Sequence, residues 1–168
     1  MFDLPLDIDQ VKGFLDPEEG RALQRALSAG AALGPALEIG AYCGKSAIWL
    51  GSAARALGIP LFSVDHHRGS EENQPGWIYH DADLWDAEAN AMDTLPHMRR
   101  ALRQAGLEEV VIPVVARSAI LARHWGTPLG FVFIDGGHTM PAALDDYRGW
   151  TPHLVRGGML AIHDVFPD

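Results

Sequence analysis

Three predicted strands of this chain end in side chains that could bind a polar ligand. Asp65, Asp135 and the pair His163-Asp164 each stand at the end of an apolar run. In an open parallel sheet, ligands bind in the crevice at the carboxyl ends of the strands. We therefore expect these carboxylates and the imidazole to face one crevice, where they offer oxygen and nitrogen atoms to a ligand.

A glycine-punctuated turn follows the first predicted strand. The run Ala36–Ile39 is apolar except for Glu38, and the loop from Gly40 to Gly44 leads directly into an amphipathic segment that begins near Ser46. Glycines permit a sharp reversal and a close approach of backbone to ligand. The helix that follows points free N–H groups into the same crevice. The spacing fits neither the dinucleotide fingerprint G-x-G-x-x-G nor the P-loop.

Strands and helices alternate along the chain and predict a doubly wound fold. Strands are predicted over 36–40, 61–65, 110–115, 131–135 and 159–163, and helices over 16–30, 46–56, 94–105, a short segment reaching 125, and 141–150. This alternation is typical of a Rossmann-like three-layer α/β/α sandwich with a mainly parallel sheet and right-handed crossovers. We expect one domain over residues 1–168, with 1–35 as a helical lead-in.

Local signals add detail to this prediction. Asp16 followed by Pro17 and two glutamates indicates a helix start. Pro113 favours an outer strand. In the last predicted helix and just after it, Tyr147, Trp150 and Leu154 are expected to point inward, and the pair Asp145-Asp146 to face solvent. Gly157 and Gly158 are expected to form a turn before the last strand.

Residues 66–94 are too long for an ordinary connection between a strand and a helix. The segment is polar and punctuated by glycine and proline, yet it carries Trp77, Tyr79, His80 and Trp85, which argue against disorder. We interpret it as a lid or substrate-recognition insert. The alternative is a surface excursion that its own aromatic residues pack together.

Two motifs resemble one enzyme family. The pattern E-x-G-x-x-x-G, from Glu38 to Gly44, resembles motif I of class I methyltransferases that use S-adenosylmethionine (SAM). The stretch from Ile134 to Val165, which contains Asp-Gly-Gly-His and His-Asp, resembles the macrocin-type O-methyltransferases of that class and, more distantly, catechol O-methyltransferase. The resemblance extends from about Leu37 to the end of the chain and implies SAM as the cofactor.

The resemblance also implies which residues bind SAM. It assigns the methionine portion to Glu38 and Gly40, the ribose to Asp65 and the adenine edge to Ser118. The expected cofactor-binding set is Glu38, Gly40, Tyr42, Gly44, Ser46, Asp65, His66, Ser118 and Asp135. Asp65 also lies 25 positions after Gly40, close to the offset of roughly 20 residues at which a carboxylate meets ribose hydroxyls in related folds.

In metal-dependent members, the acid after the fourth strand and two adjacent residues after the fifth bind a divalent cation. The matching residues are Asp135, His163 and Asp164. Carboxylates suit Mg²⁺, whereas His163 favours Mn²⁺, Fe²⁺ or another transition ion. The implied reaction is O-methylation of a small hydroxylated molecule, such as a sugar or polyketide-type scaffold, whose hydroxyl the cation orients.

His138 lies three residues after Asp135, at the position of the catalytic lysine in the catechol enzymes. The resemblance therefore makes His138, together with Asp135, the expected catalytic pair, with an imidazole whose pKa suits a general base. The alternative is that His138 only caps the helix that begins near Met140.

Composition excludes several classes of partner. The chain has 168 residues, 48% of them hydrophobic and 21% charged, and its net charge is −9. This charge argues against nucleic acid and anionic membranes, because phosphate binding requires a basic surface. No apolar run has the length of a membrane helix, and the first residues do not resemble a secretory signal. With one cysteine, we expect a cytoplasmic protein with a small-molecule substrate.

A full methyltransferase core has seven strands, and we expect the last two to be absent from this chain. The predicted sheet then has the order 3-2-1-4-5, and its exposed fifth strand favours a homo-oligomer. Two other functions stay open. One is a non-catalytic or truncated SAM-binding module. The other is a non-haem iron oxygenase-like enzyme that uses His138, His163 and an aspartate, although that triad usually occurs on a β-barrel.

Overall fold

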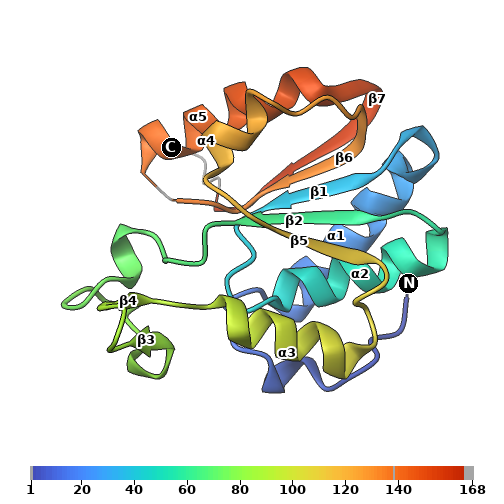
Figure 1. Cartoon of the computed structure of the whole chain (residues 1–168). Helices are drawn as coiled ribbons and strands as arrows, with labels where there is room; N and C mark the ends of the chain where they lie inside the picture. The colour runs from blue at the N-terminus through green and yellow to red at the C-terminus, as the bar shows by residue number, and fades with distance from the viewer. Residues whose placement is uncertain (1, 138, 165–168) are drawn as a thin grey trace.

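The computed structural model describes residues 2–137 and 139–164 and shows a parallel sheet with helices on both faces (Figure 1). One face is covered by α1 (Pro17–Gly30), α2 (Lys45–Leu57) and α3 (Leu95–Ala105). The other face is covered by α4 (Ser118–Ala122) and α5 (Met140–Trp150). α2 contacts both α1 and α3, whereas α4 contacts α5. The predicted Rossmann-like three-layer sandwich is confirmed.

The main sheet contains β1 (Ala36–Ile39), β2 (Leu61–Asp65), β5 (Val111–Val115), β6 (Leu129–Ile134) and β7 (Leu154–Ile162). Their order is β5-β2-β1-β6-β7, and all neighbours are parallel. The numbering differs from the predicted 3-2-1-4-5 because two short strands, β3 (Trp85–Asp86) and β4 (Ala91–Met92), intervene and pair only with each other. β6 and β7 are present as the predicted fourth and fifth strands, and β7 is the last strand in the described residues.

The register of the sheet brings the strand ends to one level. Ile39 pairs with both Val64 and Ile134, and Ile134 pairs with Ile162. The residue that follows each of these strands, or ends it, therefore lies at the same edge. Because the strand register does not shift near the carboxyl ends, residues far apart in sequence can share a site there.

The core lies on both faces of the two central strands. All six residues of β6 are buried, which explains its continuous apolar sequence, because helices cover both of its faces. In α2, every residue from Ser46 to Ala54 is buried, since this helix is packed between its neighbours and the sheet. On the opposite face, Trp150 of α5 is fully buried against the sheet.

Local signals set the helix ends as predicted. Asp16 caps α1, its side chain accepts from the backbone N–H of Glu18, and Pro17 is the first helical residue. Gly58 and Gly106 end α2 and α3 in the left-handed conformation, which glycine adopts without a steric cost. Pro113 lies in β5, at the edge of the sheet, as expected.

Three expectations near the end of the chain were wrong. β7 begins at Leu154 instead of Met159, because a bulge that contains two glycines continues the strand where a turn was expected. Asp146 is buried, with 7% of its surface exposed, whereas the solvated-face prediction holds only for Asp145. Tyr147 is 45% exposed and does not point inward.

The insert 66–94 folds without long helices or strands. It contains the 3-10 turns Glu71–Asn73 and Ala82–Leu84 and the β3-β4 hairpin, and it extends beside the carboxyl ends of the strands (Figure 1). Leu84 and Met92 are buried against Cys43, so the insert packs on the glycine loop. The other 3-10 turns are Ile8–Gln10, Ala31–Leu33 and Thr151–His153. Among the described helices, none has the length and hydropathy required to cross a membrane.

Candidate functional site

The glycine loop after β1 packs directly against the end of β6. Gly40 and Gly44 have φ angles of 90° and 94°, which favour glycine. A Cβ atom at Gly40 would overlap the carbonyl oxygen of Asp135. Gly44 begins α2 without a side-chain cap. The loop therefore needs glycine for its backbone angles and, at Gly40, for the close approach of β6.

Asp65 connects the end of β2 to this loop. Its Oδ2 atom accepts from the backbone N–H groups of Ala41 at 3.0 Å and Tyr42 at 2.8 Å, and its Oδ1 atom accepts from that of His67 at 2.7 Å. A carboxylate has about four acceptor sites. Asp65 can therefore hold the loop and still accept one hydrogen bond from a ligand hydroxyl.

Glu38 lies under the loop and is fully buried. Its Oε1 atom accepts from the Ser63 hydroxyl at 2.5 Å, whereas Oε2 has no hydrogen bond of normal geometry. Burial raises the pKa of Glu38 to about 7, the hydroxyls of Ser63 and Ser46 oppose this shift, and the nearby carboxylates add to it. A buried carboxyl group whose second oxygen lacks a well-formed hydrogen bond is ionised more readily beside a positive charge, such as the ammonium group of a methionine moiety.

Ser118 belongs to a partly buried hydrogen-bonded chain between α4 and α5. The Trp150 Nε1–H group donates to Ser118 Oγ at 2.7 Å, and the Ser118 hydroxyl donates to Asp146 Oδ1 at 2.5 Å. The one hydroxyl proton of Ser118 is used by Asp146, so toward a ligand Ser118 can only accept. Burial raises the pKa of Asp146, and the Ser118 hydroxyl opposes this shift.

Asp146 also explains a glycine that follows Asp135. A Cβ atom at Gly136 would stand 2.5 Å from Asp146 Oδ2. Sequence reasoning missed this carboxylate because it treated Asp145 and Asp146 alike. The available signal was that Asp146 lies four residues before Trp150 and so on the same face of the helix.

Asp135, His163 and Asp164 come together after β6 and β7, and we call them the acid–histidine cluster. One ligand atom from each residue lies within 4.8 Å of the others. His163 Nδ1 is 3.2 Å from Asp135 Oδ1 and 3.3 Å from Asp164 Oδ2, shared between them without a well-aligned hydrogen bond to either. His163 Nε2 is 3.2 Å from Glu19 Oε1.

The carboxylates around His163 stabilise its protonated form. The contact with Asp135 is the main cause, Asp164 and Glu19 add to it, and together they raise the pKa of His163 to about 9 against the effect of burial. Two carboxylates and an imidazole at this spacing fit a divalent cation that accepts both oxygen and nitrogen ligands. Such a cation must displace the proton of His163 Nδ1.

The remaining predicted site residues have different surroundings. Tyr42 has a φ of 47° and contacts Phe14, with ring centroids 5.7 Å apart. Ser46 is buried in the first turn of α2. His66 accepts from the backbone N–H of Arg68 at 3.0 Å, but it is the neighbouring His67 that is buried against Thr94, with 2.7 Å between Nδ1 and Oγ1. His138 lies outside the described residues.

Residues before α1 reach across the loop to the insert. Phe14 contacts Tyr79 as well as Tyr42, with 5.3 Å between the ring centroids of Phe14 and Tyr79, yet Phe14 stays 66% exposed. Lys12 Nζ is 2.6 Å from Asp81 Oδ2 and 3.0 Å from Asp83 Oδ2.

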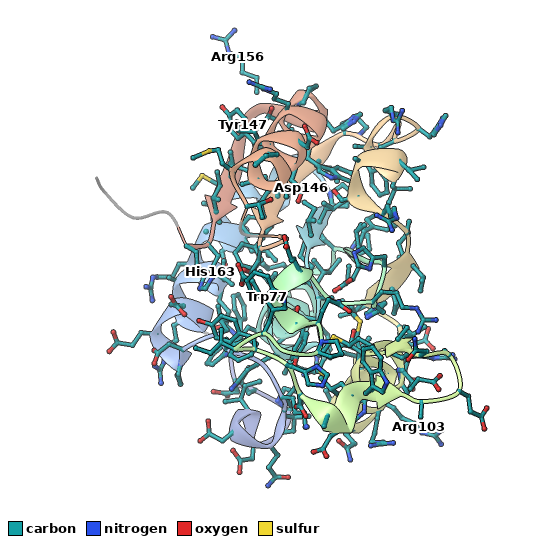
Figure 2. The ribbon with its side chains drawn as sticks, turned by 90° about the vertical axis from the view of Figure 1, so that its left-hand side faces the viewer. Trp77, Arg103, Asp146, Tyr147, Arg156 and His163 are labelled. Atoms are coloured by element: carbon teal, nitrogen blue, oxygen red, sulfur yellow. The ribbon has the colours of Figure 1, made fainter. Side chains whose placement is uncertain are left out.

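Figure 2 views the carboxyl ends of the strands and shows Trp77, Asp146 and His163 on this side.

Comparisons with known proteins then assign the family. The sequence profile described as "Methyltransferase domain" matches residues 37–165, which is most of the chain. The chain belongs to this methyltransferase family. The predicted resemblance to class I SAM-dependent methyltransferases is thereby confirmed.

Solved structures have the same fold at low sequence identity. The O-methyltransferase NovP superposes with a TM-score of 0.67 at 16% identity, over 88% of this chain and 64% of NovP. A Staphylococcus aureus structure assigned as a caffeoyl-CoA O-methyltransferase has a TM-score of 0.63 at 13% identity, over 93% and 61% of the two chains.

The SAH-bound methyltransferase PaMTH1 from Podospora anserina gives a TM-score of 0.63 at 12% identity, over 89% of this chain and 53% of PaMTH1. This methyltransferase chain thus spans less than two thirds of the length of these structures.

Proposed function

We propose that this protein is a SAM-dependent O-methyltransferase that uses a divalent cation and acts on a small hydroxylated molecule. One observation carries the proposal. The acid–histidine cluster and the loop bound by Asp65 lie at the same edge of the sheet, because β1, β2, β6 and β7 are in register there. Cofactor and acceptor hydroxyl would then meet at that edge.

SAM, when bound, supplies a methyl group on a positively charged sulfur. Asp65 has one acceptor position left for a ribose hydroxyl. Ser118 can accept from the adenine amino group because its own proton is donated to Asp146. Glu38 lies below the loop, and a methionine ammonium group beside it would favour the ionised form of its carboxyl group. The SAH carried by the Podospora anserina structure supports this choice of cofactor.

The acid–histidine cluster would hold the cation, with oxygen from Asp135 and Asp164 and nitrogen from His163. When bound, the cation would supply positive charge that lowers the pKa of an acceptor hydroxyl and would orient its oxygen. Asp135 is a candidate to receive the hydroxyl proton, and so is His138 from the sequence pattern. Most of the rate enhancement would come from positioning the oxygen in line with the methyl group.

We further propose that the insert 66–94 recognises the acceptor. Trp77 and Tyr79 are about half exposed, and Tyr79 contacts Phe14, which covers the cofactor loop through Tyr42. The Lys12 ion pairs hold this part of the insert against the lead-in. Exposed aromatic rings beside polar strand ends suit an acceptor that has an apolar ring and a hydroxyl group.

Calorimetry with S-adenosylhomocysteine tests the cofactor site. We expect wild type to bind it and Asp65→Asn to lose at least about tenfold in affinity, because a charged hydrogen bond is worth about 1.5–3 kcal/mol. Glu88→Gln, which removes the same charge from an exposed position of the insert, should bind like wild type. Equal binding by Asp65→Asn and wild type would remove the ribose assignment.

Methyl transfer to a panel of hydroxylated compounds tests the reaction and the cation. We expect turnover that EDTA abolishes and Mn²⁺ restores, and turnover that resists EDTA would remove the metal from the proposal. Cofactor binding without methylation of any panel compound would favour a non-catalytic binding module. Oxygen-dependent hydroxylation would favour the iron oxygenase alternative.

A further inference from the structure

We infer that Glu19, on the first helix, is a positioning residue for the acid–histidine cluster and sets which nitrogen of His163 faces the cation. This inference rests on the metal site proposed above. Glu19 Oε1 lies 3.2 Å from His163 Nε2, although 144 positions separate the two residues in sequence. No motif in the sequence connects them.

Both carboxylate oxygens of Glu19 have partners. Its second oxygen, Oε2, accepts from the backbone N–H of Asp16 at 2.9 Å and completes the capping box of α1. The body of α1 packs on β6 and β7, which brings the N-terminus of the helix beside the end of β7. A carboxylate fixed by its own helix start loses little further side-chain entropy when it contacts His163.

The two ring nitrogens of His163 then have different partners. Nε2 faces Glu19, whereas Nδ1 faces Asp135 and Asp164. A carboxylate that accepts from Nε2–H keeps the proton on that nitrogen, so that Nδ1 provides the free lone pair. In metal sites, such partners fix the tautomer and ring orientation of a histidine ligand, and their loss lowers metal affinity about 10- to 100-fold.

Without Glu19, the imidazole can turn about its Cβ–Cγ bond and the tautomer preference is lost. The cation would then meet a mixture of ring orientations, only one of which places Nδ1 between the two aspartates. The chemistry of the three ligands would stay the same, and only their arrangement would change. The expected defect is therefore in metal affinity and ring orientation, with the fold retained.

Mn²⁺ affinity, measured by calorimetry on the protein without cofactor or acceptor, tests this role. We expect Glu19→Gln and Glu19→Ala to bind Mn²⁺ about 10- to 100-fold more weakly than wild type. Glu18→Gln removes the same charge from the same exposed helix turn and should stay within about twofold of wild type, since a screened surface charge contributes little. Asp16→Ala weakens the helix cap but keeps Glu19, so it should lower the melting temperature and leave Mn²⁺ affinity unchanged.

Nitrogen-15 NMR of the imidazoles, with Zn²⁺ as a diamagnetic substitute, reads the ring orientation directly. Wild type should show one His163 form with metal on Nδ1 and a proton on Nε2, and Glu19→Ala should show more than one form. Equal Mn²⁺ affinity of wild type and both Glu19 variants would overturn the inference, and so would an equal loss in Glu18→Gln or Asp16→Ala. Wild type that binds no Mn²⁺ would overturn it together with the metal site, while S-adenosylhomocysteine binding would still test the cofactor site separately.

Discussion

Replacement of Glu38 by glutamine should change how the stability of the protein depends on pH. Glu38 is fully buried, and burial is the main reason why its pKa rises to about 7 from the ordinary 4.5. Below pH 4.5 the carboxyl group is protonated in both the folded and the unfolded protein. Between pH 4.5 and 7 it ionises only in the unfolded protein, so the folded state binds more protons and the unfolding free energy falls as pH rises.

The size of this fall follows from the two pKa values. Each unit of difference corresponds to about 1.4 kcal/mol, so the shift of Glu38 lowers the unfolding free energy by about 3 kcal/mol between pH 4.5 and 7. Glutamine has nearly the same size and does not ionise. Between pH 4.5 and 7, the unfolding free energy of the Glu38→Gln protein should therefore rise by about 3 kcal/mol relative to that of wild type, whatever the difference between them at low pH.

Urea unfolding followed by tryptophan fluorescence, at half-unit steps from pH 4 to 9, measures the difference. The pKa of His163 is raised to about 9, so the stabilisation from its protonated form is lost as pH rises from 6.5 to 9. Because both proteins contain His163, this loss cancels in the difference between their unfolding free energies. Glu108→Gln, which makes the same replacement at an exposed position, is the control for the substitution itself. A flat difference between pH 4.5 and 7 for Glu38→Gln would mean that the folded protein holds this carboxyl group ionised, and it would refute the burial argument.

Two further pairs of substitutions test the packing around the site. Asp146→Ala should destabilise the protein by about 1–2 kcal/mol, because the partly buried Ser118 hydroxyl loses its acceptor, whereas Asp146→Asn keeps an acceptor and should cost under about 1 kcal/mol in the same unfolding assay. Gly40→Ala should cost about 3 kcal/mol or more, since strain from positive φ adds to overlap with the Asp135 carbonyl. Gly58→Ala has a positive φ but open space, and should cost only about 1–2 kcal/mol. Similar costs for the two alanines would contradict the close approach of β6, and similar costs for Asp146→Ala and Asp146→Asn would contradict the role of the Ser118 hydrogen bond.

Sequence patterns predicted the features that depend on neighbours along the chain. The alternation of apolar strands and amphipathic helices predicted the layers, and Asp16 with Pro17 predicted the start of α1. At β7 the local sequence misleads, because Gly157 and Gly158 predict a turn but lie within the strand. There the ladder with β6 continues through a bulge, and tertiary pairing overrides the tendency of two glycines to end a strand.

Part of the site also followed from sequence. Parallel strands in register must place the residues after them at one edge, so Asp135, His163 and Asp164 were expected together, and the structure brings them within ligand distance of each other. Long-range contacts were not accessible in this way. Asp146 accepts a hydrogen bond from Ser118, which lies 28 positions earlier in the chain, and Trp150 donates to the same hydroxyl.

The sequence by itself therefore determined the fold, the glycine turn and the polar strand ends, because these depend on periodicity, backbone preference and the geometry of a parallel sheet. Only the tertiary structure decided which side chains surround those residues. Asp65 accepts from the glycine loop because β2 lies beside β1. Glu19 contacts His163 because packing of α1 on the sheet brings together groups 144 positions apart. No local pattern encodes such a distance, since it results from the way whole elements pack.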